Sequence, residues 1–238
     1  PLAKVEATKG YGAEVVLVPG AFDDAAAKAV ELQKEFGYTF AHPYNDDYVM
    51  AGQGTIGLEI MEQAPDADCV IIPIGGGGIA AGIAYAIKNI KPECTVIGVQ
   101  ADEASAMVNS IRSGVLGTTA TANTIADGCA VKAPGDKTFA VCKEYLDDVV
   151  SVSEEAIAIA MLALAEKGKV VSEGAGAMPT AAVMSGKVDA SKYKKIVCMV
   201  SGGNVDIGMQ QKLFTKALTA TGRMAEISTE VSDKAYAA

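Results

Sequence analysis

Four consecutive glycines, Gly75 to Gly78, stand between a short apolar run and a segment with helical spacing. The apolar run, Cys69 to Ile74, is rich in branched residues, which is typical of a strand covered on both faces. In a glycine turn that opens a helix, the backbone amides point at one place, with the positive end of the helix dipole behind them. The pattern therefore predicts a binding site for a phosphate group.

A strand, a helix and a second strand position these glycines. Ile79, Ile83 and Ile87 recur at helical spacing, and Thr95 to Val99 repeats the apolar character of the first strand. A unit of this length implies a right-handed parallel crossover. A tight turn without a ligand is the other interpretation, but each glycine costs conformational entropy on folding, which favours a functional loop.

The loop itself leaves the kind of phosphate ligand open. A Walker nucleotide loop is excluded because no Gly-Lys-Ser or Gly-Lys-Thr follows the glycines. Gly76, Gly78 and Ala81 fit the dinucleotide spacing G-x-G-x-x-G/A, and Asp102 follows the next strand, where a ribose-binding acid could sit. A nicotinamide-dependent oxidoreductase is therefore one alternative, and a non-catalytic module that binds phosphorylated metabolites at the same loop is another.

Composition narrows the classes of partner. The 238 residues carry a formal charge of −9 and no basic cluster, so we expect no nucleic-acid partner and no membrane partner. No apolar run approaches the roughly 20 residues that span a bilayer, and no signal peptide opens the chain. We therefore expect a cytoplasmic protein, and an exposed alanine-rich helical surface predicts a homo-oligomer.

The metal-binding residue types are sparse. Five cysteines, an odd number without C-x-x-C spacing, indicate reduced and mostly buried thiols rather than disulfides or metal ligands. The single histidine, His42, precedes Pro43 and is interpreted as a turn residue without a catalytic role. We expect no metal site.

Upstream of the central unit, the pattern predicts a small α/β layer. Strands are predicted at Glu14 to Val18 and Tyr38 to Ala41, on either side of a helix from Phe22 to Phe36. The polar, turn-rich residues 42–48 then mark a candidate domain boundary.

The next predicted helix, which starts near Gly52, contains three glycines. Glycine inside a helix costs about 1 kcal/mol, so Gly52, Gly54 and Gly57 predict the close approach of another backbone.

Downstream, two further strands are predicted, Asp148 to Val152 and Ile196 to Val200. The last strand ends at Ser201 and two glycines, so two parallel strands each end in a glycine turn. Ligands of open α/β sheets bind beyond the carboxyl ends of the strands, and both turns can contact one cofactor there. We expect an α/β fold with an open, mostly parallel twisted sheet and helices on both faces.

Six motifs carry a resemblance to a known family. They are, in chain order, AGQGTIGLEIMEQ, VIIPIGGGGIAAGIA, VIGVQADEASAM, TIADGC, VVSEGAGA and VSGGNVDI. As a set they resemble the catalytic domain of the pyridoxal-phosphate-dependent threonine and serine dehydratases, with the catabolic threonine ammonia-lyases closest and serine racemase a near relative. The resemblance implies fold type II of these enzymes, which is similar to the tryptophan synthase β subunit. It also implies pyridoxal 5′-phosphate as cofactor.

The implied reaction converts L-threonine or L-serine to a 2-oxo acid and ammonia, and a small-molecule allosteric effector is a further implied partner. The backbone amides of Gly75, Gly76, Gly77, Gly78 and Ile79 would hold the cofactor phosphate. Ser201 would hydrogen-bond the pyridine nitrogen. Its hydroxyl is neutral, so the ring is a weaker electron sink than one beside a carboxylate, which favours elimination of a β-hydroxyl group.

The resemblance implies further site residues. Gly128 and Glu173 would lie beside the ring and the substrate, and Tyr44 near the phenolic edge of the cofactor. The racemase-like relatives have asparagine at the position of Tyr44, which favours a dehydratase. They also carry an acidic cation ligand where this chain has Gln100.

Two family motifs are absent. The cofactor lysine of the family lies in a Ser-Phe-Lys-x-Arg-Gly segment, and its substrate carboxylate loop is Ser-x-Gly-Asn-His; neither occurs here. Lys187 and Lys234 have the Ser-x-Lys spacing but lack the arginine and glycine, so the catalytic base is unknown. The chain begins at Pro1, and we expect a fragment without the N-terminal part that is inactive alone. Its expected parts are a remnant of the small domain (1–41), the large cofactor-binding domain (42–213) and a tail toward a truncated regulatory ACT-like region (214–238).

Overall fold

A parallel sheet forms the centre of the molecule. The computed structural model describes residues 2–20, 22–225 and 227–228. Within them the sheet has four strands in the order β3-β2-β1-β4, and each neighbouring pair is parallel. The strands are β1 (Cys69–Pro73), β2 (Thr95–Ala101), β3 (Asp148–Val152) and β4 (Ile196–Cys198).

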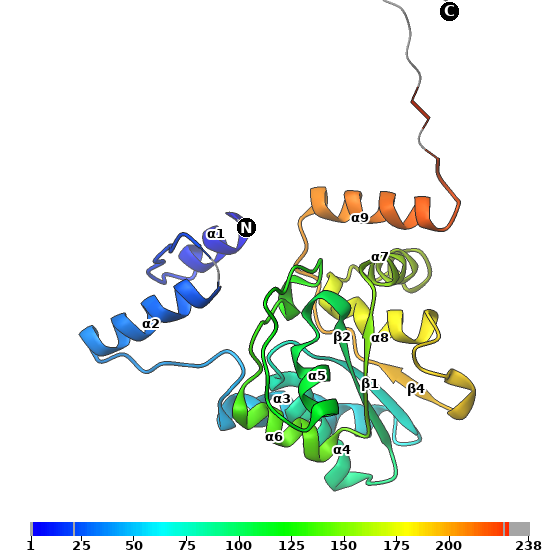
Figure 1. Cartoon of the computed structure of the whole chain (residues 1–238), viewed down its shortest axis with the longest axis horizontal. Helices are drawn as coiled ribbons and strands as arrows, with labels where there is room; N and C mark the ends of the chain where they lie inside the picture. Colours follow the sequence, from blue (N-terminus) through cyan, green and yellow to red (C-terminus); the bar gives the residue numbers. More distant parts are fainter. Residues whose placement is uncertain (1, 21, 226, 229–238) are drawn as a thin grey trace, which may run out of the picture.

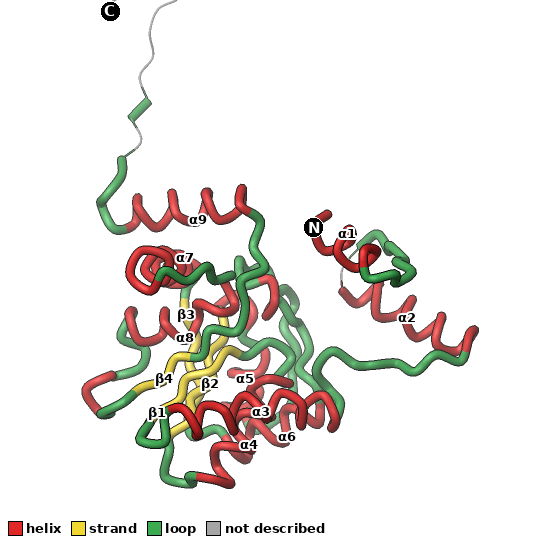
Figure 2. The backbone as a smooth tube through the Cα atoms, turned by 180° about the vertical axis from the view of Figure 1, so that it is seen from behind, coloured by secondary structure: helices red, strands yellow, loops and turns green. Residues whose placement is uncertain are grey.

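Helices cover both faces of this sheet (Figures 1 and 2). The α-helices are α1 (Leu2–Gly10), α2 (Phe22–Phe36), α3 (Asp47–Gln63), α4 (Gly78–Ile90), α5 (Ala106–Ser113), α6 (Asp136–Tyr145), α7 (Glu154–Ala163), α8 (Gly174–Met184) and α9 (Ile207–Ala220). Short 3-10 turns are η1 (Asp102–Ala104), η2 (Asp127–Cys129) and η4 (Ala190–Lys192), and a π-helical turn, η3 (Leu164–Gly168), extends α7.

Two core clusters lie on opposite faces of the sheet because side chains alternate along each strand. Ile71 of β1 joins Met161 of α7 and Met178 of α8 in one cluster. Ile72 and Val96 join residues of α3, α4, α5 and α6 in the other. The expected α/β fold, with a parallel sheet covered on both faces, is confirmed.

The prediction of two strands near the N-terminus is wrong. Residues 14–18 and 38–41 form no strand and have no regular secondary structure, and they flank α2 with Val16 and Tyr38 exposed. An extended segment becomes a strand only when a neighbour supplies ladder hydrogen bonds, and no described segment pairs with either.

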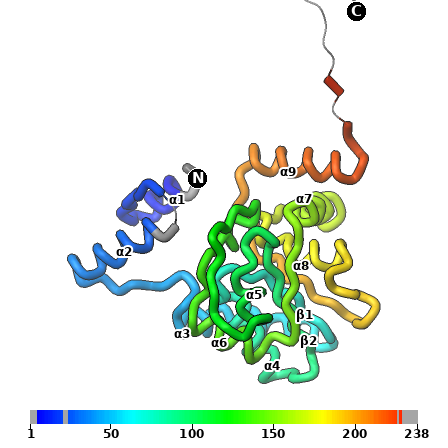
Figure 3. Tube along the Cα trace, in the orientation of Figure 1, coloured from blue at the N-terminus to red at the C-terminus, as the bar shows by residue number. Residues whose placement is uncertain are grey.

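The helices α1 and α2 are set apart from the sheet and its covering helices (Figures 1 and 3), and no described residue before Met50 joins the core clusters. The division at residues 41 and 42 stays a prediction. The boundary at residues 213 and 214 falls inside α9, which packs on α7. Residues 226 and 229–238 of the predicted tail lie outside the described residues.

Among the described helices, none is long and apolar enough to cross a membrane.

An N-cap moves the start of α3 upstream of the predicted position near Gly52. The carboxylate of Asp46 accepts hydrogen bonds from the amides of Tyr48, at 2.9 Å, and Val49, at 3.1 Å. It satisfies two of the amides that a helix start leaves without a partner. The glycines that follow are tolerated inside a helix that is anchored at its first turn.

We expect Asp46→Ala to lower the free energy of unfolding by about 1 kcal/mol, because those amides lose their acceptor. Urea unfolding of the two chains measures the difference. Asp46→Ser is the matched control, since a serine oxygen caps equally well. Equal stability of the alanine and serine variants would contradict this role.

The helices α3 and α4 are in backbone contact, as two of the three glycines predicted. A Cβ atom on Gly54 would lie 3.2 Å from the carbonyl oxygen of Gly82, and one on Gly57 would lie 2.9 Å from the Cβ of Ala86. The prediction is wrong for Gly52, because a Cβ there would meet nothing within 4 Å.

Candidate functional site

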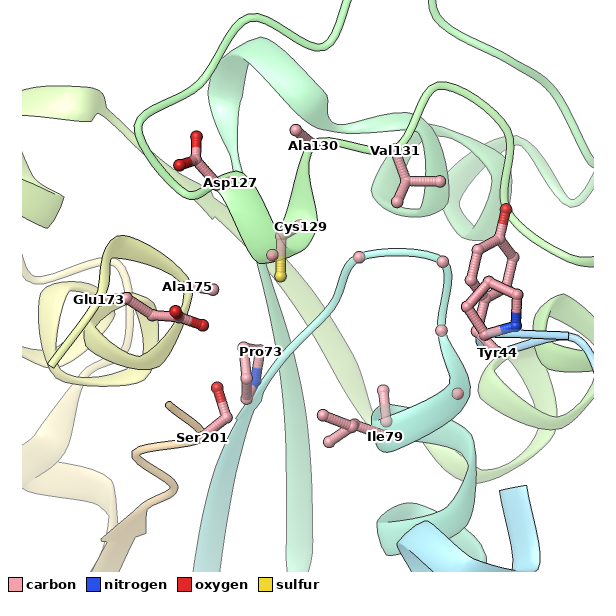
Figure 4. Close-up of a pocket in the computed structure, with 17 residues that line it drawn as sticks. Tyr44, Pro73, Ile79, Asp127, Cys129, Ala130, Val131, Glu173, Ala175 and Ser201 are labelled. Atoms are coloured by element: carbon pink, nitrogen blue, oxygen red, sulfur yellow. The ribbon is translucent and has the colours of Figure 1, made fainter. Parts of the chain in front are cut away.

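One cavity brings together the nine site residues that the family resemblance implies. It has a volume of about 540 Å³ and opens beyond the carboxyl ends of β1 and β4 (Figure 4). The predicted residues that line it are Tyr44, Gly75, Gly76, Gly77, Gly78, Ile79, Gly128, Glu173 and Ser201. They come from five separate segments of the chain, so the fold and not local sequence makes the cavity.

The glycine loop forms the central wall. The amide of Ile74 makes the last ladder bond, donating to the carbonyl of Val99 at 2.7 Å. Gly77 then caps α4 with a φ of 101°, a conformation that side chains other than glycine rarely adopt. The first helical bond runs from the amide of Ala81 to the carbonyl of Gly77 at 2.8 Å. The amides at the start of α4 therefore lack helical partners and are donors for an anion.

Tyr44 forms the wall opposite Glu173 (Figure 4). A Cβ atom on Gly76 would overlap the Tyr44 ring, and one on Gly78 would lie 3.0 Å from the Tyr44 Cα. The hydroxyl of Tyr44 donates to the carbonyl of Ala133 at 3.0 Å. Only glycine therefore fits beneath this ring.

His42 holds the turn before α3. Its Nδ1 accepts hydrogen bonds from the amides of Tyr44, at 3.2 Å, and Asn45, at 2.8 Å. The structure thus places His42 at a turn, as interpreted, and its lack of a catalytic role stays a prediction.

Glu173 and Ser201 line the other side of the cavity (Figure 4). Glu173 caps the start of α8, and its Oε2 accepts from the amide of Asn204 at 3.1 Å. Its own amide donates to the carbonyl of Gly202 at 3.0 Å. These two bonds fix the glycine turn after β4, and with it Ser201. Gly128 adjoins the same carboxylate, since a Cβ there would lie 3.2 Å from Oε1.

Cys129 is a cavity residue that sequence reasoning missed. Its thiol is buried and lies between Glu173 and the glycine loop (Figure 4). Burial raises the pKa of this thiol to about 12, and the negative charge of Glu173 acts in the same direction. The thiol is therefore neutral at physiological pH. The motif TIADGC contains it, but a lone cysteine beside a singled-out glycine gave no chemical signal.

Gln100 and Asp102 do not line the cavity. Gln100 is fully buried, and its Oε1 accepts from the amide of Val108 at 2.8 Å. Asp102 is exposed at the start of η1. Among the described residues, no group of three or more His, Cys, Asp or Glu side chains could hold a metal ion.

The cavity suits a phosphate ester but holds no lysine among the described residues that line it. Lys187 is exposed beyond the C-terminal end of α8, whereas the cavity adjoins the N-terminal end of that helix. Lys234 lies outside the described residues. Neither candidate therefore supplies a cavity base in the described part of the chain.

Comparison with known proteins gives the family to which this chain belongs. The family model described as pyridoxal-phosphate dependent enzyme matches residues 1–202, so the chain belongs to this family. It is 47% identical over 234 residues to an L-threonine ammonia-lyase of Thermotoga maritima, covering 98% of this chain and 58% of that protein. It is 50% identical over 208 residues to the catabolic L-threonine dehydratase TdcB of Escherichia coli K12, covering 87% of this chain and 63% of that protein.

Solved structures of similar proteins agree with this family. The processed form of threonine deaminase isoform 2 from Solanum lycopersicum has 35% identity and a TM-score of 0.84, covering 91% of this chain and 64% of that one. Maize serine racemase has 35% identity and a TM-score of 0.84, covering 93% and 68%. The family and fold expected from the motifs are confirmed. The chain spans about three fifths of the length of the curated relatives, between 58% and 63% of the two named here.

Proposed function

We propose that this chain carries the cofactor-binding part of a pyridoxal-phosphate-dependent ammonia-lyase that converts L-threonine or L-serine to a 2-oxo acid and ammonia. One observation carries the proposal: a glycine loop at a helix N-terminus faces Glu173 and Ser201 across a single cavity. The relatives named L-threonine ammonia-lyase and threonine dehydratase support the choice of reaction.

The glycine loop would bind the phosphate of the cofactor. The amides of Gly75 to Ile79 and the positive end of α4 supply several donors, and the four glycines add no side chain beside them. A Cβ atom on Gly75 would lie 3.0 Å from the Cα of Cys129, so the cavity has its present width only with glycine there. The cradle fits a phosphate monoester.

Ser201 would donate to, or accept from, the pyridine nitrogen at the opposite side. When bound, pyridoxal phosphate supplies an electron sink for the Cα of an amino acid. The Ser201 hydroxyl places no charge beside the ring nitrogen, which weakens this sink and favours loss of a β-hydroxyl group over a long-lived carbanion. Cys129 keeps its proton and adds no charge of its own to this wall of the cavity.

Tyr44, Gly128 and Glu173 would shape the space around the ring and the substrate. The described cavity holds no lysine to move the Cα proton, so we expect this chain to bind the cofactor reversibly and to release no 2-oxobutanoate from threonine. A homo-oligomer, a small-molecule effector and a cytoplasmic location are further parts of the proposal for the whole protein.

The test is a titration of the chain with pyridoxal phosphate, in which the absorbance of the cofactor reports binding. We expect saturable binding that inorganic phosphate displaces, and weaker binding of pyridoxal, because most of the contacts go to the phosphate. Borohydride reduction and digestion should label no single lysine stoichiometrically. One such lysine, together with 2-oxobutanoate from threonine, would show that the base lies in this chain.

Two other results would favour the alternatives. Saturable NAD binding that Asp102→Ala removes would indicate a nicotinamide enzyme. Phosphate binding with no preference for pyridoxal phosphate over other phosphate esters would indicate a non-catalytic module.

A further inference from the structure

Thr138 of α6 lies behind the glycine loop, on the side away from the cavity, and is fully buried. Its Oγ1 donates to the carbonyl of Gly76 at 2.6 Å. The carbonyl of Gly135, at 3.1 Å, competes for the same proton, but it already accepts the helical bond from the amide of Phe139 at 2.9 Å. A hydroxyl has one proton, so the shorter contact to Gly76 takes it.

We propose that Thr138 is a positioning residue that turns the amide of Gly77 toward the phosphate; the inference rests on the proposed function. In a trans peptide the carbonyl of one residue and the amide of the next point in opposite directions. A hydroxyl that holds the Gly76 carbonyl on the α6 side therefore holds the Gly77 amide on the cavity side.

A loop of glycines needs such an anchor more than other loops do. Glycine occupies left-handed and right-handed regions about equally, so the peptide between Gly76 and Gly77 has little preference of its own. Turned over, it would place a carbonyl oxygen, instead of a donor, against the phosphate.

Two longer hydrogen bonds also hold carbonyls of this loop. Gly75 accepts from the side-chain amide of Gln100 at 3.5 Å. Gly76 also accepts from the amide of Gly135 at 3.4 Å. The hydrogen bond from the Thr138 hydroxyl is the shortest of the three. Replacing that hydroxyl by a methyl group removes it.

The shape of Thr138 matters separately from its hydroxyl. A Cβ atom on Gly77 would lie 2.8 Å from the Cβ of Thr138, so the loop is packed tightly against this side chain. Thr138→Val keeps the branched shape and removes only the donor. Thr138→Ser keeps the donor.

The experiment measures dissociation constants for pyridoxal phosphate, inorganic phosphate and pyridoxal, well below the melting temperature of each chain. For Thr138→Val we expect about a tenfold or greater loss of affinity for both phosphates, because one charge-assisted hydrogen bond is lost, and no change for pyridoxal. Thr138→Ser should bind both phosphates as the native chain does. Ser110→Ala is the control, since Ser110 is a buried hydroxyl that bonds Ala106 and Gly117, away from the loop.

Unchanged phosphate affinity in Thr138→Val, or an equal loss for pyridoxal, would overturn the role of Thr138 and leave the proposed function intact. Absence of phosphate binding by the native chain would overturn both. If Thr138→Val does not fold, amide chemical shifts of the native chain decide the matter. Added phosphate should shift the Gly77 amide proton strongly, and an unmoved signal would refute the assigned orientation.

Discussion

Gly82→Ala should lower the free energy of unfolding by about 3 kcal/mol, while Gly52→Ala should raise it by about 0.5–1 kcal/mol. The two changes add the same methyl group to helix interiors. At Gly82 the new Cβ would overlap the carbonyl oxygen of Met50 and lie 2.6 Å from the amide nitrogen of Gly54. Both atoms are backbone, so α3 and α4 must move apart. At Gly52 it would meet nothing within 4 Å.

The opposite sign at Gly52 follows from the unfolded chain. Alanine has fewer accessible backbone states than glycine, and at an exposed helical position it loses less entropy on folding. Urea unfolding of the two variants beside the native chain measures both effects. If both alanines stabilise the chain, the close contact between α3 and α4 does not exist in solution.

Raising the pH from 9 to 11 should destabilise the fold by roughly 5 kcal/mol through the two thiols Cys129 and Cys142 alone. Burial raises the pKa of each from 9.0 to about 12. Above pH 9 the unfolded chain therefore releases these protons while the folded chain keeps them. Since the folded state then binds more protons, stability falls as pH rises, through the window from 9 to about 12.

A single substitution isolates this effect from other groups that titrate at high pH. Cys142→Ala removes one thiol, so its free energy of unfolding should fall less steeply between pH 9 and 11, by about 1.4 kcal/mol per pH unit. Urea unfolding at several pH values gives both slopes. Parallel curves for the native and Cys142→Ala chains would show that this thiol ionises normally in the fold. Native Cys142 should also resist thiol reagents at pH 8.

The parts of the fold that the sequence predicted are those governed by local pattern. The run Cys69 to Ile74 and the glycines after it specify β1 and its loop without reference to the rest of the chain, because burial on both faces and a glycine turn leave a local signature. Gly54 and Gly57 predicted a close helix contact for the same reason. The predicted strands at residues 14–18 and 38–41 depended on partners, which an apolar pattern does not reveal.

For the cavity, too, the sequence predicted the residues that lie in recognisable motifs and missed those that depend on distant contacts. Family motifs named Gly75 to Gly78, Glu173 and Ser201, and the structure brings them together. Thr138 was missed because its contact with Gly76 spans 62 positions of the chain and its residue type is common in helices and turns. Cys129 was missed because its place in the wall of the cavity follows only from the packed fold.

Residues 42–47 lie at the end of the connection from α2 to α3. Tyr44, one of these residues, forms a wall of the cavity. The Tyr44 ring covers Gly76, and the adjoining Asn45 donates to the carboxylate of Asp136 at 2.7 Å. Any ligand that binds better with this ring in place also restricts this connection, and the effect is reciprocal. A change that favours the position of the Tyr44 ring seen here would strengthen the binding of such a ligand by the same factor. We therefore expect ligand binding in the cavity to be coupled to the position of Tyr44, and through it to the segment that leads back to α2.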